Sequence, residues 1–294
     1  MSDAKFISTI NDPNSIITPI DNAIRFPEIL DILMAKYEKD IQLFCSLIES
    51  SSSSGELLDK IRSNSIASDT RMSLLKMFRR CVSPVLDTET TKKISKVSTQ
   101  SLIENYGHTF KPISVLKSQF ADLSKDKLAA LAALIGEYDT RGQLGYLLTD
   151  MFFKWFEERF KGVYSIEGPR GAGRDVELRT VFEDYNGNFP CDFVIRDMNK
   201  NVKAIGFARY DSTRGGAQSD DRTGGNANKV DKAKEFCNAT GKKIKLIFLS
   251  DGPGLTHKDT WAESCELDGA WDGNVRVVTL KIADQRISPD WLDQ

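Results

Sequence analysis

Two charged residues, Asp192 and Arg209, stand in a segment whose sequence predicts a β-hairpin. Residues 191–195 and 202–210 have the apolar, β-branched character of strands, and residues 198–201 between them are typical of a turn. Pairing of these strands would place Asp192, at the start of the first, within a few residues of Arg209, near the end of the second. A carboxylate beside a cation is suited to hold a hard metal ion and a phosphate group.

Further acids lie on both sides of the expected hairpin. Asp220 and Asp221 come eleven and twelve residues after Arg209, in a segment rich in glycine and charge, close enough to fold back toward it. Asp175 is a rival first acid, and Glu177 is a rival second acid. Each of these residues also has an ordinary explanation as a surface acid, a salt-bridge partner or a helix cap. Their occurrence around one hairpin favours a catalytic, metal-binding site.

The chemistry that fits these residue types is metal-assisted hydrolysis of a phosphodiester. Such hydrolysis near neutral pH calls for one or two hard cations, and magnesium takes oxygen ligands while keeping several waters. The sequence therefore predicts a Mg²⁺-dependent nuclease. Its expected catalytic residues are Asp192, Arg209, Asp220 and Asp221. Its expected metal ligands are Asp192, Asp221, Asp175 and Glu177.

Basic and amide side chains near the acids are candidates for contacts with DNA. Arginine pairs with guanine and glutamine with adenine in the major groove, and lysine neutralises phosphates. The candidates are Arg170, Arg174, Arg214, Gln218, Arg222 and Lys229. The whole chain has a net charge of −2, so any affinity for DNA has to come from local basic stripes.

Composition excludes several other classes of function. Five cysteines, widely spaced and without a CxxC pair, argue against a zinc knuckle or a disulfide framework and favour a reducing, cytoplasmic compartment. The first residues contain no apolar signal segment, and no run of eighteen apolar residues predicts a membrane span. The glycine-rich loop 168–173 lacks the Gly-Lys-Ser/Thr of a phosphate-binding loop, so we expect a turn or a loop that approaches DNA.

Hydrophobic periodicity predicts a helical region followed by an α/β region. Residues 1–20 read as an irregular arm, residues 24–49 and 57–86 have helical spacing, and residues 87–112 are polar and break the pattern. Helical spacing returns at 128–135 and 144–160, and residues 228–239 read as another helix. Residues 243–250 and 274–282 read as strands. We expect a helical N-terminal region at 1–120 and, at 121–294, a mixed central β-sheet flanked by helices.

These motifs resemble the PD-(D/E)xK nuclease superfamily, in particular its type II restriction endonucleases. The resemblance is carried by Pro190-x-Asp192, by the hairpin and its charged end at Arg209, and by the preceding aromatic helix, and it covers roughly residues 128–255. It implies a restriction-endonuclease-like core that cuts double-stranded DNA at a short sequence with Mg²⁺, as a homodimer if that sequence is symmetric. The chain departs from the acid-x-lysine pattern because Phe207 and Arg209 occupy those places. Asp220 or Asp221 would then supply the acid that is missing from this pattern.

Two other interpretations remain open at the level of the sequence. The missing acid-x-lysine is compatible with a non-catalytic DNA-binding or regulatory protein on a degenerate nuclease fold, which metal-dependent cleavage would distinguish from an enzyme. The long polar N-terminal region is compatible with a helical interaction protein that carries an α/β domain, and this interpretation predicts no affinity for DNA.

Overall fold

The computed structural model describes residues 5–21, 24–137, 143–171, 173–212 and 220–294, with the backbone alone at 220–224. The chain divides into two compact units. One is helical and consists of Ala23–Arg141, and the other joins Met1–Asn22 to Gly142–Gln294. The division therefore lies about twenty residues beyond the expected position at 120. The reason is that the helix at Lys125–Gly136 packs against the first long helix rather than against the sheet.

The helical unit is built around one long helix, α1, at Glu28–Ser50. Its buried residues recur every three to four positions, as an amphipathic helix requires. The other elements are α2 Ser54–Ile61, α3 Ser68–Cys81, α4 Thr88–Thr91, α5 Thr99–Tyr106, η4 Gly107–Thr109, α6 Ile113–Phe120 and α7 Lys125–Gly136. Two of them, α4 and α5, lie in the polar segment where we expected no regular structure. Side-chain caps begin both, since Asp87 accepts a hydrogen bond from the Thr90 amide and Ser98 accepts one from the Ser101 amide.

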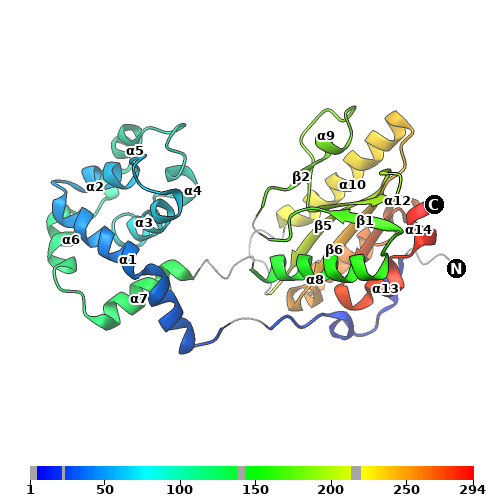
Figure 1. Ribbon diagram of the computed structural model, residues 1–294, viewed down its shortest axis with the longest axis horizontal. Coiled ribbons are helices and arrows are strands. Elements are labelled where there is room, and N and C mark those ends of the chain that lie inside the picture. The colour runs from blue at the N-terminus through cyan, green and yellow to red at the C-terminus, as the bar shows by residue number, and fades with distance from the viewer. Residues whose placement is uncertain (1–4, 22–23, 138–142, 172, 213–219) are drawn as a thin grey trace. The chain divides into compact units, whose positions relative to one another are not determined.

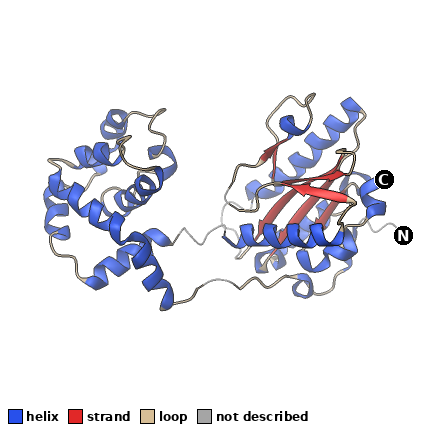
Figure 2. Ribbon diagram, in the orientation of Figure 1, coloured by secondary structure: helices blue, strands red, loops and turns tan. Residues whose placement is uncertain are grey.

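The second unit is a mixed α/β fold, as the sequence predicts (Figures 1 and 2). Its five-stranded sheet has the order β1-β4-β5-β6-β7, in which β1, β4 and β5 pair antiparallel and β5, β6 and β7 pair parallel. A separate two-stranded ribbon joins β2 to β3. The strands are β1 Tyr164–Glu167, β2 Val176–Glu177, β3 Pro190–Cys191, β4 Phe193–Asp197, β5 Val202–Tyr210, β6 Lys245–Asp251 and β7 Val275–Val278.

Helices connect and flank these strands. They are α8 Gln143–Arg159, α9 Leu178–Val181, α10 Asp220–Thr240, α11 Lys258–Leu267, α12 Ala270–Gly273, α13 Ala283–Arg286 and α14 Pro289–Asp293, with short 3₁₀ turns η5 Pro253–Thr256 and η6 Leu280–Ile282. In the described parts of both units, none of the helices combines the length and the apolar character that crossing a bilayer requires.

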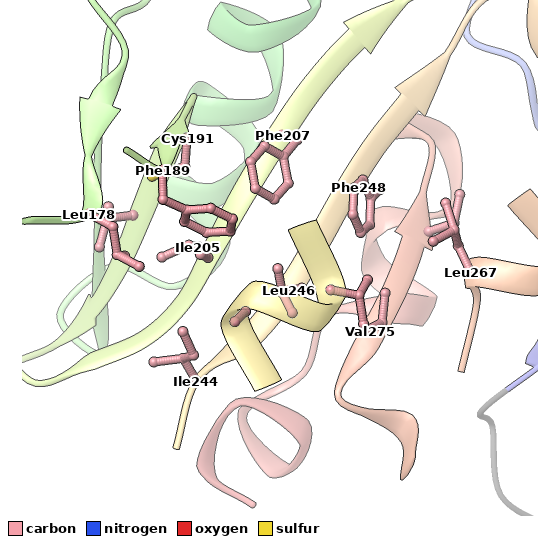
Figure 3. Packing of buried hydrophobic residues seen from close by; sticks show 14 of the residues in the cluster. Leu178, Phe189, Cys191, Ile205, Phe207, Ile244, Leu246, Phe248, Leu267 and Val275 are labelled. Atoms are coloured by element: carbon pink, nitrogen blue, oxygen red, sulfur yellow. The ribbon is translucent and has the colours of Figure 1, made fainter. Parts of the chain in front are cut away.

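The two faces of the sheet bury separate cores. Strand side chains alternate between faces, so Ile205 and Phe207 of β5 pack with the apolar side of α10, whereas Ala204 packs with the aromatic side of α8. Figure 3 shows the α10 face, where Phe207 lies beside Phe248 of β6 with ring centroids 5.2 Å apart. The hairpin that carries Asp192 and Arg209 is thus held between two packed layers.

The N-terminal segment belongs to this second core rather than forming the irregular arm that we expected. It contains two short 3₁₀ turns, η2 Ile7–Thr9 and η3 Pro13–Ile16. Ile7 is fully buried, and its amide donates a hydrogen bond of 3.0 Å to Asp268. The Thr279 hydroxyl donates to the carbonyl of Ile16. These contacts join residues far apart in the chain, which local periodicity does not reveal.

Candidate active site

Asp192 stands at the point where the chain changes its strand partner. The preceding strand β3 pairs with β2, and the following strand β4 pairs with β1 and β5. The Asp192 amide donates to the Gly206 carbonyl at 2.9 Å, and the Ala208 amide donates to the Asp192 Oδ2 atom at 2.7 Å. The carboxylate is therefore fixed against β5, as the expected hairpin implied, and no donor to its Oδ1 atom is found among the described residues.

Close backbone packing keeps Asp192 in place. Gly168, just after β1, has a φ of 154°, and a Cβ atom there would lie 2.3 Å from the Asp192 carbonyl oxygen. A larger residue at 168 would have to push the Asp192 backbone aside. The glycine-rich loop 168–173 thus begins with a glycine that the position of Asp192 requires.

The second carboxylate beside Asp192 belongs to Asp175. In the β2–β3 ribbon Val176 faces Cys191 and Glu177 faces Pro190, so the same register continued by one residue sets Asp175 opposite Asp192. The pKa of Asp192 is raised, mainly by burial and further by the negative charge of Asp175. Of the two rival acids, Asp175 is therefore the one beside Asp192, whereas Glu177 faces Pro190, one step farther along the ribbon.

Lys229 of α10 is the third charged residue that acts on this pair of aspartates. The Lys229 Nζ atom lies 4.1 Å from the centroid of the Phe207 ring, and the side chain is partly buried. Burial lowers the pKa of Lys229, while the charges of Asp192 and Asp175 act in the opposite direction. The lysine correspondingly lowers the pKa of Asp192. Asp175 and Lys229 thus both act on the charge of Asp192, and we call these three residues the DDK cluster.

The sequence predicts Lys229 only as a DNA contact. A signal for a closer role was present, because Lys229 precedes the buried residues Ala233 and Phe236 by four and seven positions. That spacing places a lysine on the apolar stripe of a helix, where a cation needs a partner.

Arg209 lies within a few residues of Asp192 in the hairpin, as expected, but its ion pair is with Asp211. Its Nε atom donates to Asp211 Oδ1 at 2.6 Å. Asp211 is itself fixed, because its amide donates to the Asp251 carbonyl and its carbonyl accepts from the Gly254 amide. The positive charge of Arg209 nevertheless lowers the pKa of Lys229, so the arginine borders the cluster.

The other candidates lie elsewhere or outside the described residues. Arg170 forms ion pairs with Glu157 and Asp150 on α8, and Arg174 is exposed ahead of β2. The backbone of α10 begins at Asp220, but the side chains of Asp220, Asp221 and Arg222 are outside the described part of the chain. Arg214 and Gln218 also lie outside the described residues. The proposal that a second acid comes from 220 or 221 therefore stays a prediction.

The oxygen donors present suit a magnesium ion rather than a softer metal. Among the described residues, no group of three histidine, cysteine or acidic side chains comes together as a complete set of metal ligands. Asp192 and Asp175 still offer two carboxylates, which is sufficient for Mg²⁺ because that ion keeps waters and takes further oxygens from a bound phosphate.

Comparisons with known proteins add no relative to this picture: no family model, no curated protein and no solved structure matches the chain. Function therefore has to be argued from the DDK cluster and from the sheet that positions it.

Proposed function

We propose that the protein is a divalent-metal-dependent nuclease that hydrolyses phosphodiester bonds in double-stranded DNA. The observation that carries this proposal is the DDK cluster, in which two carboxylates and a partly buried lysine from three separate segments of the chain act electrostatically on one another beside the start of β4. Two carboxylates provide the oxygen ligands for Mg²⁺, and a lysine beside them provides charge for a phosphate.

Each residue of the cluster has a defined task in this proposal. Asp192 and Asp175 would hold the cation, which when bound polarises the phosphate and makes a coordinated water more acidic. Lys229 lies near the two carboxylates. Because its pKa is lowered, it releases a proton more readily than an exposed lysine does. A Lys229 amine that has first released its own proton would accept the proton of the water as the water oxygen bonds to phosphorus. The leaving ribose oxygen would take a proton from solvent as its bond to phosphorus breaks. Arg209 stays charged and contacts a neighbouring phosphate.

The order of elements supports the same proposal. Helix α8, the hairpin β4–β5, helix α10 and the parallel strand β6 follow one another in the order that the resemblance to PD-(D/E)xK nucleases implies. In that comparison Lys229 of α10 takes the place of the lysine missing from β5, where Arg209 stands. Cleavage at a short symmetric sequence by a cytoplasmic homodimer of the restriction type is the form of the activity that we propose.

Cleavage of DNA by the purified chain tests the proposal. Unmethylated phage DNA with Mg²⁺ should give discrete fragments, and EDTA or Asp192→Asn should abolish them. Asp231→Asn, an exposed acid two residues after Lys229 on α10, is the matched control and should cut like the wild type. Intact DNA with the wild-type chain, across several DNAs and with Mn²⁺ as well, would refute the proposed activity.

One observation favours a second function, a non-catalytic DNA-binding protein on the same fold. Phe207 stands where an acid would complete the usual pattern, and it is 7% exposed and stacked on Phe248 in the core. The β5 strand therefore contributes packing where an acid would bind metal. This function predicts retention of DNA on a gel without cleavage under any metal condition.

A further inference from the structure

A hollow lies at the other end of the β4–β5 hairpin from the DDK cluster. Its volume is about 350 Å³, and it is lined by the end of α9, the hairpin turn and the connection between α10 and β6. Arg196, in its lining, follows Asp192 by four residues along the strand, which is roughly 13 Å of extended chain. The hollow is therefore separate from the carboxylates.

The described lining of this hollow is positive and contains no carboxylate. Four of its nine residues are cations: Arg196, Lys200, Lys242 and Lys243. Acids outside the lining hold two of them, since Glu167 accepts from Arg196 at 3.0 Å and Asp184 pairs with Lys242. Lys200 and Lys243 are exposed, and neither has an ion pair with a described residue. Two positive charges thus remain uncompensated around the hollow.

The turn beside the hollow fixes the backbone of Lys200 and the guanidinium of Arg196. The Asp197 carboxylate accepts from the amides of Asn199 and Asn201, both at 2.9 Å. Lys200 has a left-handed φ of 68°, a conformation that usually falls to glycine or asparagine. The Lys200 carbonyl accepts from the Arg196 guanidinium at 3.0 Å. A lysine in a constrained turn is thereby tied to an arginine of the same hollow, so part of the charge is preorganised.

We propose that this hollow binds a phosphate group. A guanidinium fork with several ammonium groups is the side-chain set that recognises phosphate oxygens. The walls formed by Val202 and Ile244 are apolar and strengthen the field of the cations by displacing water. The phosphate comes either from a free phosphate or nucleotide, or from the backbone of a nucleic acid. Binding here requires no cleavage and does not depend on the proposed nuclease activity.

A pair of double variants tests the proposal. Lys200→Gln with Lys243→Gln removes the two uncompensated charges. Lys161→Gln with Lys281→Gln removes two exposed lysines elsewhere on the same unit and is the matched control. Lys200→Arg with Lys243→Arg retains the charge. Thermal unfolding midpoints check that all three variants are folded. Binding is measured by NMR titration with inorganic phosphate and with adenosine monophosphate, and by fluorescence anisotropy with a short duplex in EDTA at several salt concentrations.

The outcomes separate the two sources of phosphate. A free ligand predicts saturable shifts at Arg196 and Lys242, with an affinity that weakens about tenfold or more in the first variant only and with DNA affinity unchanged. A backbone phosphate predicts that the slope of log affinity against log salt falls by about two in the first variant only, and that the arginine variant restores it. Equal behaviour of the glutamine variant and its matched control in both titrations would overturn the proposal.

Discussion

Three aspartates of the α/β unit, two fully buried and one half-buried, are held in two different ways. Asp268 and Asp251 are fully buried, and every oxygen of each has a donor. Asp268 accepts from the amides of Ile7 and Val277 and from the Arg286 guanidinium. Asp251 accepts from the amides of Thr18, Gly252 and Leu280. Among the described residues, Asp192 accepts one such bond, from the Ala208 amide, and it has a second acid as its neighbour.

The difference teaches how to separate structural from functional acids in this fold. Asp268 and Asp251 join the N-terminal segment to the end of the sheet, and their buried charge is compensated within the chain. Asp192 is held by the chain but is not saturated by it, and Asp175 opposes its charge. A carboxylate in that state is stabilised by an external cation, which is the property a metal ligand needs.

The largest expected effect is on cleavage, from Asp192→Asn. The amide is a weaker metal ligand and bears no charge, so cleavage should fall at least about 1,000-fold, or about 4 kcal/mol in the barrier. The pKa of Asp192 is raised in the folded state, so its ionisation opposes folding as the pH rises above its unfolded value. The variant should therefore be more stable than the wild type at pH 7, as measured by urea denaturation. A loss of stability with retained cleavage would place Asp192 among the structural acids.

The same aspartate-to-asparagine change at a fully hydrogen-bonded acid, Asp268→Asn, should lower the free energy of unfolding. Its partner Arg286 has a side chain only 1% exposed, and an uncompensated buried charge costs roughly 3–5 kcal/mol. Urea denaturation beside Asp231→Asn measures this loss. Cleavage per folded molecule should remain at the wild-type value at temperatures where the variant is folded. An unchanged free energy of unfolding in Asp268→Asn would contradict the distinction between Asp268 as a structural acid and Asp192 as a metal ligand.

Lys229→Gln should have an intermediate effect on cleavage, about 100-fold, which is typical for loss of one positioned charge or proton acceptor. The lysine holds down the pKa of Asp192, so its removal should move the acidic limb of the rate profile to higher pH. Rates measured from pH 5 to 9 on wild type and variant test both effects. An unshifted acidic limb would mean that Lys229 does not act on Asp192.

The smallest expected effect is from Arg209→Gln. This arginine is engaged with Asp211 and its side chain is 44% exposed, so solvent screens its charge. We expect a cleavage rate within about tenfold of the wild type and a weaker affinity for DNA at low salt, measured by anisotropy in EDTA. A loss as large as that of Lys229→Gln would return Arg209 to the centre of the site.

Local patterns in the sequence predicted the main elements around the site, and they named Asp192 and Asp175 as metal ligands and Lys229 as a DNA contact. The hairpin, α8, α10 and β6 each have a clear periodicity, and Asp192 stands at a recognisable strand start. Asp175 was named but not distinguished from Glu177, because β2 and β3 have two residues each and give no periodic signal. The role of Lys229 depends on which face of α10 meets β5. The buried contacts of Ile7 depend on residues more than two hundred positions away.

The central claim is that Asp192, Asp175 and Lys229 form one coupled site. NMR titration of the Asp192 carboxyl carbon tests it in the wild type, in Asp175→Asn and in Lys229→Gln. The account predicts a pKa above the ordinary aspartate range in the wild type, a lower value in Asp175→Asn and a higher value in Lys229→Gln. The same Asp192 pKa in all three proteins would contradict it, since no coupling would then exist among the three side chains.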